Sequence, residues 1–230
     1  MNSIPITIID DFLENPKTLR DYALKLNYTP NPDSTWPGTR SDSIDVLNPG
    51  LFRYLSYKIL SLFVPVRKGP EILNTGFKCQ MNFQIIESEG SGWIHQDPNI
   101  FTSILYLNDE KDSTNCGTSL YSLKPNIVFP YLSQDDINLS LQRIDHYKTG
   151  KISKDLETQK NHFNKKTYDK LLDIPNKFNR LISFSSEMFH SANLYSNSFN
   201  TPRLTLICFW DFIHSDLLLP IPRSKRIPMI

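Results

Sequence analysis

A strict alternation of polar and apolar side chains constrains the fold of this chain more than any other feature of the sequence. From Cys79 to Ile86, the polar residues Gln80, Asn82 and Gln84 alternate with Cys79, Met81, Phe83 and Ile85. This period of two is typical of a β-strand with two unlike faces. Similar runs recur at Phe101–Leu107, Thr118–Leu123, Arg180–Ser185 and Arg203–Phe212. Because turn residues separate the runs, the sequence predicts a β-rich α+β fold with a jelly-roll core, as a sandwich or an open antiparallel barrel.

Two helices are predicted before this β-rich part, and a short β-branched run, Ile4–Ile9, precedes both. Asn15-Pro16 has the pattern of a helix start, with Asn as N-cap and Pro at the first helical position, and Asn48-Pro49 repeats it. Apolar residues follow each start at helical spacing. A loop containing Pro and Gly is expected between them, from Tyr28 to Asp42. We expect both helices to buttress a sheet.

One long segment interrupts the series of strands. Roughly 55 residues separate Tyr121 from Asn179, whereas ordinary connections have about 4–6. The stretch 153–172 is highly charged with scattered apolar residues, which favours surface helices. We therefore expect one domain, 1–230, made of an N-terminal strand with supporting helices (1–70), a jelly-roll core (71–121 and 178–214) and a helical insertion (122–177).

The composition narrows the class of partner. The chain has 25 Lys and Arg against 24 Asp and Glu, so its formal net charge of +1 creates no overall field toward nucleic acid or an anionic membrane. No apolar run approaches the roughly 20 residues that span a bilayer, and the N-terminus lacks a signal-peptide pattern. Three widely spaced cysteines favour a reducing compartment. We expect a soluble cytoplasmic protein with a small-molecule or peptide partner, and the sequence leaves its oligomeric state open.

The candidate metal ligands are His95, Asp97 and His190. In extended backbone the two-residue spacing of His95 and Asp97 puts an imidazole and a carboxylate on one face. His190 follows the strand-like run Leu181–Ser185, and the chain would bring it back to the site formed by His95 and Asp97. Two histidines and one carboxylate form the facial triad that leaves positions on iron(II) open for a bidentate oxo acid and dioxygen.

The other three histidines are weaker candidates. His146 and His162 lie among polar residues of the insertion, so we expect them to be solvated. His214 follows the last strand and has only Asp211 and Asp216 as nearby carboxylates. The triad is therefore the set that the sequence favours.

Arg203 is the candidate anion-binding residue. It begins an apolar strand, and a buried guanidinium requires an anionic partner because an unpaired charge in a low-dielectric setting is costly. The distal carboxylate of 2-oxoglutarate would supply that partner through a bidentate pair. Thr205 shares the face of Arg203 and would add a hydroxyl. Asn82 or Gln84, from the face that they share on their strand, is a candidate to contact the metal-proximal carboxylate. The alternative for Arg203 is an exposed arginine at the start of a strand, and the alternative for the two amides is a position on the solvent side of the sheet.

In order and spacing, these motifs resemble the double-stranded β-helix iron(II)- and 2-oxoglutarate-dependent dioxygenases, especially the prolyl-hydroxylase-like branch. The motifs are His95-x-Asp97, Tyr106-Leu107-Asn108, Gly117–Tyr121, His190 and Arg203. The resemblance implies that Tyr106 contacts the distal carboxylate. The stretches Ile9–Leu13, Pro37–Ser41 and Asn179–Ile182 are similar to a subgroup found in bacteria and their phages. The likeness spans nearly the whole chain.

The resemblance implies a hydroxylase that uses iron(II), 2-oxoglutarate and dioxygen and releases succinate and carbon dioxide. Family members that halogenate replace the triad carboxylate by a small residue, so Asp97 favours hydroxylation. The expected substrate is a peptidyl or free amino-acid side chain or another small metabolite. The walls or lid of its site are expected from the insertion, which is either a lid or structural, and from four aromatic residues, namely Trp36, Trp93, Phe101 and Tyr121. The alternatives are a non-catalytic jelly-roll binding or structural protein with a degenerate metal site, and a cupin-type metalloenzyme that does not use 2-oxoglutarate.

Overall fold

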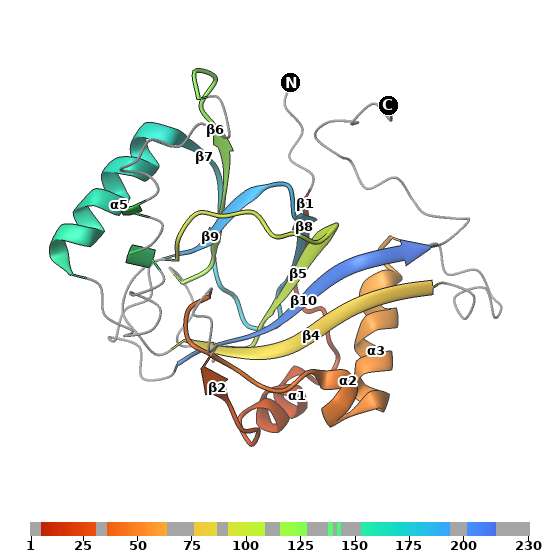
Figure 1. Cartoon of the computed structure of the whole chain (residues 1–230). Helices are drawn as coiled ribbons and strands as arrows, with labels where there is room; N and C mark the ends of the chain where they lie inside the picture. Colours follow the sequence, from red (N-terminus) through yellow and green to blue (C-terminus); the bar gives the residue numbers. More distant parts are fainter. Residues whose placement is uncertain are drawn as a thin grey trace.

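Two antiparallel β-sheets pack face to face, with helices on the outer side of the larger one (Figure 1). The computed structural model describes residues 6–30, 36–63, 76–86, 92–108, 116–127, 138–139, 142–143, 153–193 and 202–214. Within these ranges no helix has the length and apolar character needed to cross a membrane. The stretch 194–201 before the last strand, the start of the expected run Ile4–Ile9, and His146 lie outside the described residues.

The larger sheet has seven strands, all paired antiparallel. Their spatial order is β1 (Ile6–Ile9), β8 (Leu181–Ser185), β5 (Phe101–Tyr106), β10 (Arg203–His214), β4 (Gly76–Ile86), β3 (Thr39–Arg40) and β2 (Thr29–Pro30). Strand β10 is central and pairs with β4 on one side and with β5 on the other. Segments far apart in the sequence therefore lie next to each other at the centre of the sheet.

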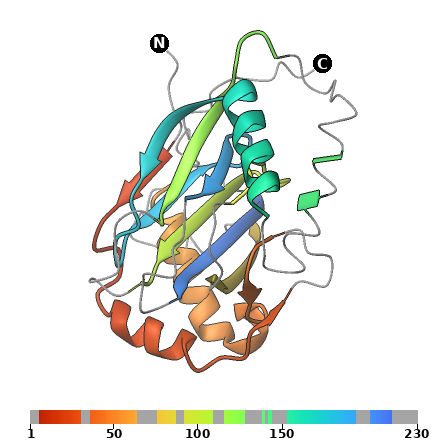
Figure 2. The same ribbon diagram turned by 90° about the vertical axis from the view of Figure 1, so that its left-hand side faces the viewer.

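The smaller sheet has three strands in the order β7 (Tyr168–Ile174), β6 (Thr118–Leu123) and β9 (Phe189–Ala192). Helix α5 (Lys154–Thr167) leads directly into β7 and lies beside this sheet in both views (Figures 1 and 2). We expected surface helices throughout this segment; α5 is present, and β7 is a strand of the core that the sequence did not indicate. The charged pattern of 153–172 concealed this strand, whose exposed residues are mostly charged.

Three helices cover the outer face of the larger sheet: α1 (Pro16–Ala23), α2 (Ile44–Leu47) and α3 (Pro49–Leu60) (Figure 1). Both predicted helix starts are confirmed, and the Asn48 side chain caps α3 by accepting a hydrogen bond from the Leu51 amide at 3.0 Å. The stretch expected as a loop from Tyr28 to Asp42 supplies the two short strands β2 and β3 instead. Edge strands of two residues leave too little pattern in the sequence to be detected.

Alternation along β10 divides its side chains between two environments. Leu204, Leu206, Cys208 and Trp210 are buried against the helices in the main apolar core. A second apolar cluster, which includes Ile104, Leu120 and Ile182, fills the space between the two sheets. Residues of the opposite parity on β10 face the inner side of the fold, where a cavity opens. The predicted jelly-roll architecture is therefore confirmed, and its inner face positions the site.

Candidate active site

The structure brings the three predicted metal ligands together. One donor atom from each of His95, Asp97 and His190 can be chosen so that all lie within 4.8 Å of one another. The Nε2 atoms of His95 and His190 lie 3.6 and 3.3 Å from the Asp97 carboxylate. The two histidines reach each other from different segments because their backbones form an isolated β-bridge, with N–H to O distances of 2.8 and 3.0 Å.

Backbone carbonyls fix the orientation of both imidazoles. The Nδ1 atom of His95 lies 2.8 Å from the carbonyl oxygen of Trp93, and Nδ1 of His190 lies 3.0 Å from that of Met188. A carbonyl can only accept, so each Nδ1 carries the proton and each Nε2 presents a lone pair toward the centre. This second contact sets the tautomer that a metal-binding histidine requires.

Asp97 is held as a carboxylate. Burial alone would raise its pKa, but the polar groups beside it, the imidazoles of His190 and His95 and the Thr102 hydroxyl, hold that pKa below its ordinary value. Burial and the neighbouring His190 lower the pKa of His95 to about 3, against the opposing influence of Asp97. The Thr102 hydroxyl donates to Asp97 Oδ2 at 2.7 Å. At neutral pH the cluster thus offers one charged oxygen donor and a neutral imidazole of His95.

Arg203 lines the same cavity as the triad, and it is almost fully buried. Its Nε donates to the carbonyl of Cys116 at 2.7 Å, and Nη2 lies 3.5 Å from the carbonyl of Gly117. A Cβ on Gly117 would lie 1.8 Å from the carbonyl oxygen of Ile174, so only glycine permits this close packing. Among the described residues no carboxylate pairs with Arg203.

Tyr106 and Thr205, the other candidate residues near Arg203, do not themselves line the cavity. Tyr106 is fully buried, and its hydroxyl donates to Thr118 Oγ1 at 2.7 Å; Thr118 in turn lines the cavity. Burial raises the pKa of Tyr106, so it remains a neutral donor. Thr205 lies opposite Tyr106 in the sheet, and its buried Oγ1 has no hydrogen-bond partner in the part of the chain that the structure describes.

The two amide candidates on β4 differ in position. Gln84 lines the cavity and donates to the carbonyl of Pro37 at 2.7 Å. Asn82 does not line it; its amide donates to the carbonyl of Ser41 at 2.9 Å, which ties β4 to the segment after β3. Facing alone nominated both amides equally, and the structure places Gln84, and not Asn82, at the cavity wall.

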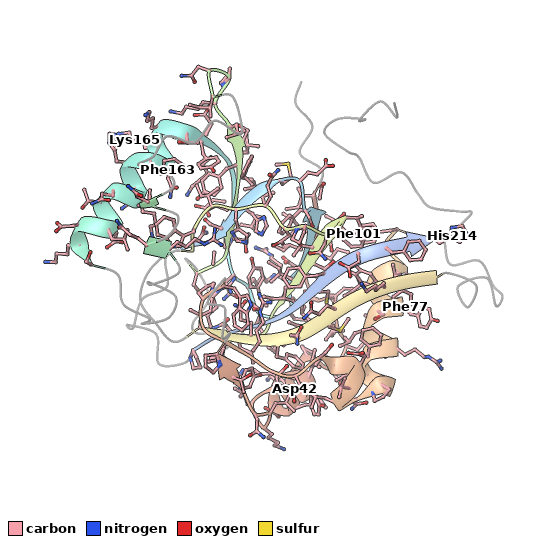
Figure 3. All side chains as sticks on the ribbon, in the orientation of Figure 1. Asp42, Phe77, Phe101, Phe163, Lys165 and His214 are labelled. Atoms are coloured by element: carbon pink, nitrogen blue, oxygen red, sulfur yellow. The ribbon has the colours of Figure 1, made fainter. Side chains whose placement is uncertain are left out.

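The cavity has a volume of about 570 Å³, within the range of small-molecule sites. Of the four aromatic residues expected as its walls, only Trp36 lines it. Phe101 stacks on Trp210 in the apolar core, where Figure 3 labels it, and Tyr121 lines a separate cavity near α5. The expected wall positions were wrong for these residues because their strands turn them away from the site.

The remaining described histidines lie away from the cluster, as expected. His162 is exposed on α5, and His214 lies exposed at the end of β10, close to Phe77 in Figure 3. Neither lines the cavity. Thr102 and Arg40 are among the cavity residues that the sequence reasoning missed. The strand of Thr102 was predicted without a role for it, and Arg40 belongs to a stretch that contributed only to the resemblance.

A family model covers residues 88–210, which is more than half of the chain. The chain belongs to the DUF6445 family, a family of unknown function. This span includes the triad and Arg203, and it begins after β4 and the N-terminal helices. No curated protein matches the sequence significantly.

Solved structures show the fold that this family member adopts. HygX from Streptomyces hygroscopicus with nickel and 2-oxoglutarate bound is similar with a TM-score of 0.54 at 10% identity, over 90% of this chain and 83% of that one. HygX with iron bound gives 0.50 at 8% identity, over 90% and 82%. A Pseudomonas putida prolyl-4-hydroxylase gives 0.48 at 12% identity, over 91% and 93%. The two HygX structures thus confirm the resemblance to 2-oxoglutarate-dependent oxygenases for the fold, the double-stranded β-helix.

Proposed function

We propose that this protein is an iron(II)- and 2-oxoglutarate-dependent oxygenase that hydroxylates a small molecule, an amino-acid side chain first among the candidates. The observation that carries the proposal is that one cavity is lined both by a cluster of two histidines and one carboxylate and by Arg203. Arg203 is buried, and no carboxylate of the described residues pairs with it. Either feature alone has a structural explanation. Together they match the needs of a metal-chelated dicarboxylate.

The donor set fits iron(II). His95, Asp97 and His190 would hold the metal on one side and leave the side toward the cavity open. When bound, iron(II) with 2-oxoglutarate supplies the activation of dioxygen, with succinate and carbon dioxide as co-products. The protein contributes the geometry: carbonyl contacts orient the two imidazoles, and Thr102 orients the carboxylate.

The residues around Arg203 fit a carboxylate. An arginine buried to 3% exposure without an anion is costly, and a carboxylate at its guanidinium would remove that cost. Thr205 Oγ1, which has no partner among the described residues, would donate to the anion. The hydroxyl of Tyr106 would also donate to it on exchanging its present acceptor, Thr118 Oγ1, for the carboxylate. Buried polar atoms without partners are uncommon in folded proteins, which supports a ligand at this end of the cavity.

The test is binding of 2-oxoglutarate to the iron(II)-loaded protein without oxygen, followed by succinate formation once oxygen is admitted. We expect a visible charge-transfer absorption on adding 2-oxoglutarate, and its loss in Asp97→Ala and in His190→Ala. His162→Ala is the matched control, because it removes an exposed histidine on α5. Near-wild-type succinate formation by Asp97→Ala would refute the ligand assignment.

The same measurements separate the rival functions. A cupin-type metalloenzyme would bind the metal through the triad without responding to 2-oxoglutarate. A binding or structural protein with a degenerate site would bind neither. Binding of both, with loss of the 2-oxoglutarate response in Arg203→Met, would support the assignment of Arg203 to the cosubstrate.

A further inference from the structure

Arg40 lies in the same cavity as the triad, on a strand that the sequence did not indicate. It ends the two-residue strand β3, which lies between β4 and the edge strand β2, and it pairs with Gln84 of β4. The turn before it passes close to the sheet: Gly38 has φ +75°, and a Cβ there would lie 2.1 Å from the carbonyl oxygen of Ile85. This close approach fixes the strand that carries Arg40 against the cavity wall.

Two aromatic rings hold the guanidinium of Arg40. Its central carbon lies 4.1 Å from the ring centre of Trp36 and 5.2 Å from that of Phe209. Both rings line the cavity as well. Cation–π contacts of this kind restrict the side chain without neutralising its charge.

Arg40 has no anionic partner among the described residues. No carboxylate lies within ion-pair distance, and its buried Nε has no hydrogen-bond partner. Burial lowers the pKa of Arg40 to about 10, against the opposing charge of Asp97, so the side chain stays protonated at neutral pH. The protein thus maintains a positive charge at a site where charge is costly.

The proposed cosubstrate does not account for this charge. A divalent metal and Arg203 bring three positive charges, and Asp97 with the 2-oxoglutarate dianion brings three negative ones, so these groups balance. Asp211, another carboxylate on the cavity wall, pairs with Lys78 at 3.1 Å. Arg143 also lines the cavity, and it makes interactions of its own. Among the described residues, the charge of Arg40 has no carboxylate partner, and in the loaded site it would attract a further anion.

We propose that Arg40 binds a carboxylate of the substrate, so that the substrate is a small carboxylic acid, such as a free or N-acylated amino acid, and not an internal peptide segment. The proposal rests on the proposed function, because it assigns the second anion of that site. A planar guanidinium with aromatic contacts on its faces still offers its N–H edge, which matches a carboxylate in bidentate geometry.

The test uses protein loaded with nickel(II) and 2-oxoglutarate, which measures binding without turnover. N-acetyl-L-amino acids are titrated as free acids and as their N-methylamides, with tryptophan fluorescence as the readout because Trp36 touches Arg40. We expect at least one acid to bind ten-fold or more tightly than its amide. Arg40→Met should abolish this preference, Arg40→Lys should restore part of it, and both should retain 2-oxoglutarate binding.

Arg53→Met is the matched control, since it removes one exposed positive charge on helix α3 and should leave the preference for acids unchanged. Unfolding midpoints of the variants establish that each is folded. The proposal is overturned if no acid binds, if acids and amides bind alike, or if Arg40→Met weakens 2-oxoglutarate binding ten-fold, which would assign Arg40 to the cosubstrate. If nickel and 2-oxoglutarate do not bind to the wild-type protein, the proposed function fails as well, so the two failures are distinguishable.

Discussion

The hydrogen bond from Thr102 to Asp97 makes a quantitative prediction about metal affinity. Thr102 is buried at the start of β5, and its hydroxyl lies 2.7 Å from Asp97 Oδ2 and 3.0 Å from the hydroxyl of Ser186. Thr102→Val keeps the volume of the side chain and removes the donor. A hydrogen bond to a charged group contributes about 1.5–3 kcal/mol. Since about 1.4 kcal/mol is a factor of ten, the variant should bind iron(II) about 10- to 100-fold more weakly.

The assay is competition with a chromogenic chelator under anaerobic conditions, for the wild-type protein, Thr102→Val and Thr102→Ser. Serine retains the hydroxyl, so Thr102→Ser should bind iron(II) within about three-fold of wild type. Urea unfolding of the metal-free proteins separates a change in metal affinity from a loss of folding. If folded Thr102→Val binds iron(II) as tightly as wild type, Thr102 does not orient the ligand carboxylate, and the reasoning is refuted.

Three further predictions concern stability and the cosubstrate pocket. Thr205→Val removes a buried hydroxyl that has no partner among the described residues, so it should raise the free energy of unfolding of the metal-free protein by about 1 kcal/mol in urea titrations. The same variant should bind 2-oxoglutarate about ten-fold more weakly. A lower free energy of unfolding than wild type would contradict the first expectation. Gly117→Ala places a Cβ 1.8 Å from the carbonyl oxygen of Ile174, so it should destabilise the protein by at least about 2 kcal/mol, and a wild-type unfolding midpoint would contradict this. A hydrogen bond from Arg180 holds the pKa of Asp10 far below its ordinary value of 3.8, so this contact stabilises the fold above that pH and is lost as the pH falls toward the folded-state pKa. Because Asp10 is 37% exposed, Asp10→Asn should cost only about 1 kcal/mol at pH 7, and the difference from wild type should narrow below pH 4; a constant difference across this range would exclude the linkage.

The strands that carry the predicted site could be predicted from the sequence because alternation of polar and apolar residues is a local pattern. Alternation along β4 and β10 reflects the unlike faces of a sheet, and each side chain contributes to the pattern at its own position. His95 and Asp97 were found by spacing within three residues, and His190 by elimination among five histidines. Their roles as ligands stay predictions that the metal-binding experiments address.

Other parts of the site depend on contacts between distant segments, which leave no periodic trace. Arg40 reaches the cavity through a two-residue strand that pairs with β4, more than forty positions later. Thr102 has a neighbour in the sequence at Asp97, but its donor role depends on how the turn after His95 folds back. Tyr121, by contrast, has an aromatic ring and a hydroxyl that suit a binding pocket. It follows a register shift in β6, between Leu120 and Tyr121, and it lines another cavity.

The sequence by itself determined the type of fold, the positions of most core strands, two helix starts and the residue types that suit a metal–dicarboxylate site. Only the tertiary structure decided which of those residues share a cavity, because that depends on strand pairing and on the packing of two sheets. It placed Gln84 rather than Asn82 at the wall, held Arg203 on two backbone carbonyls, and left Arg40 beside the site without a carboxylate partner among the described residues. Local alternation states which way a side chain faces, whereas long-range pairing decides what it faces.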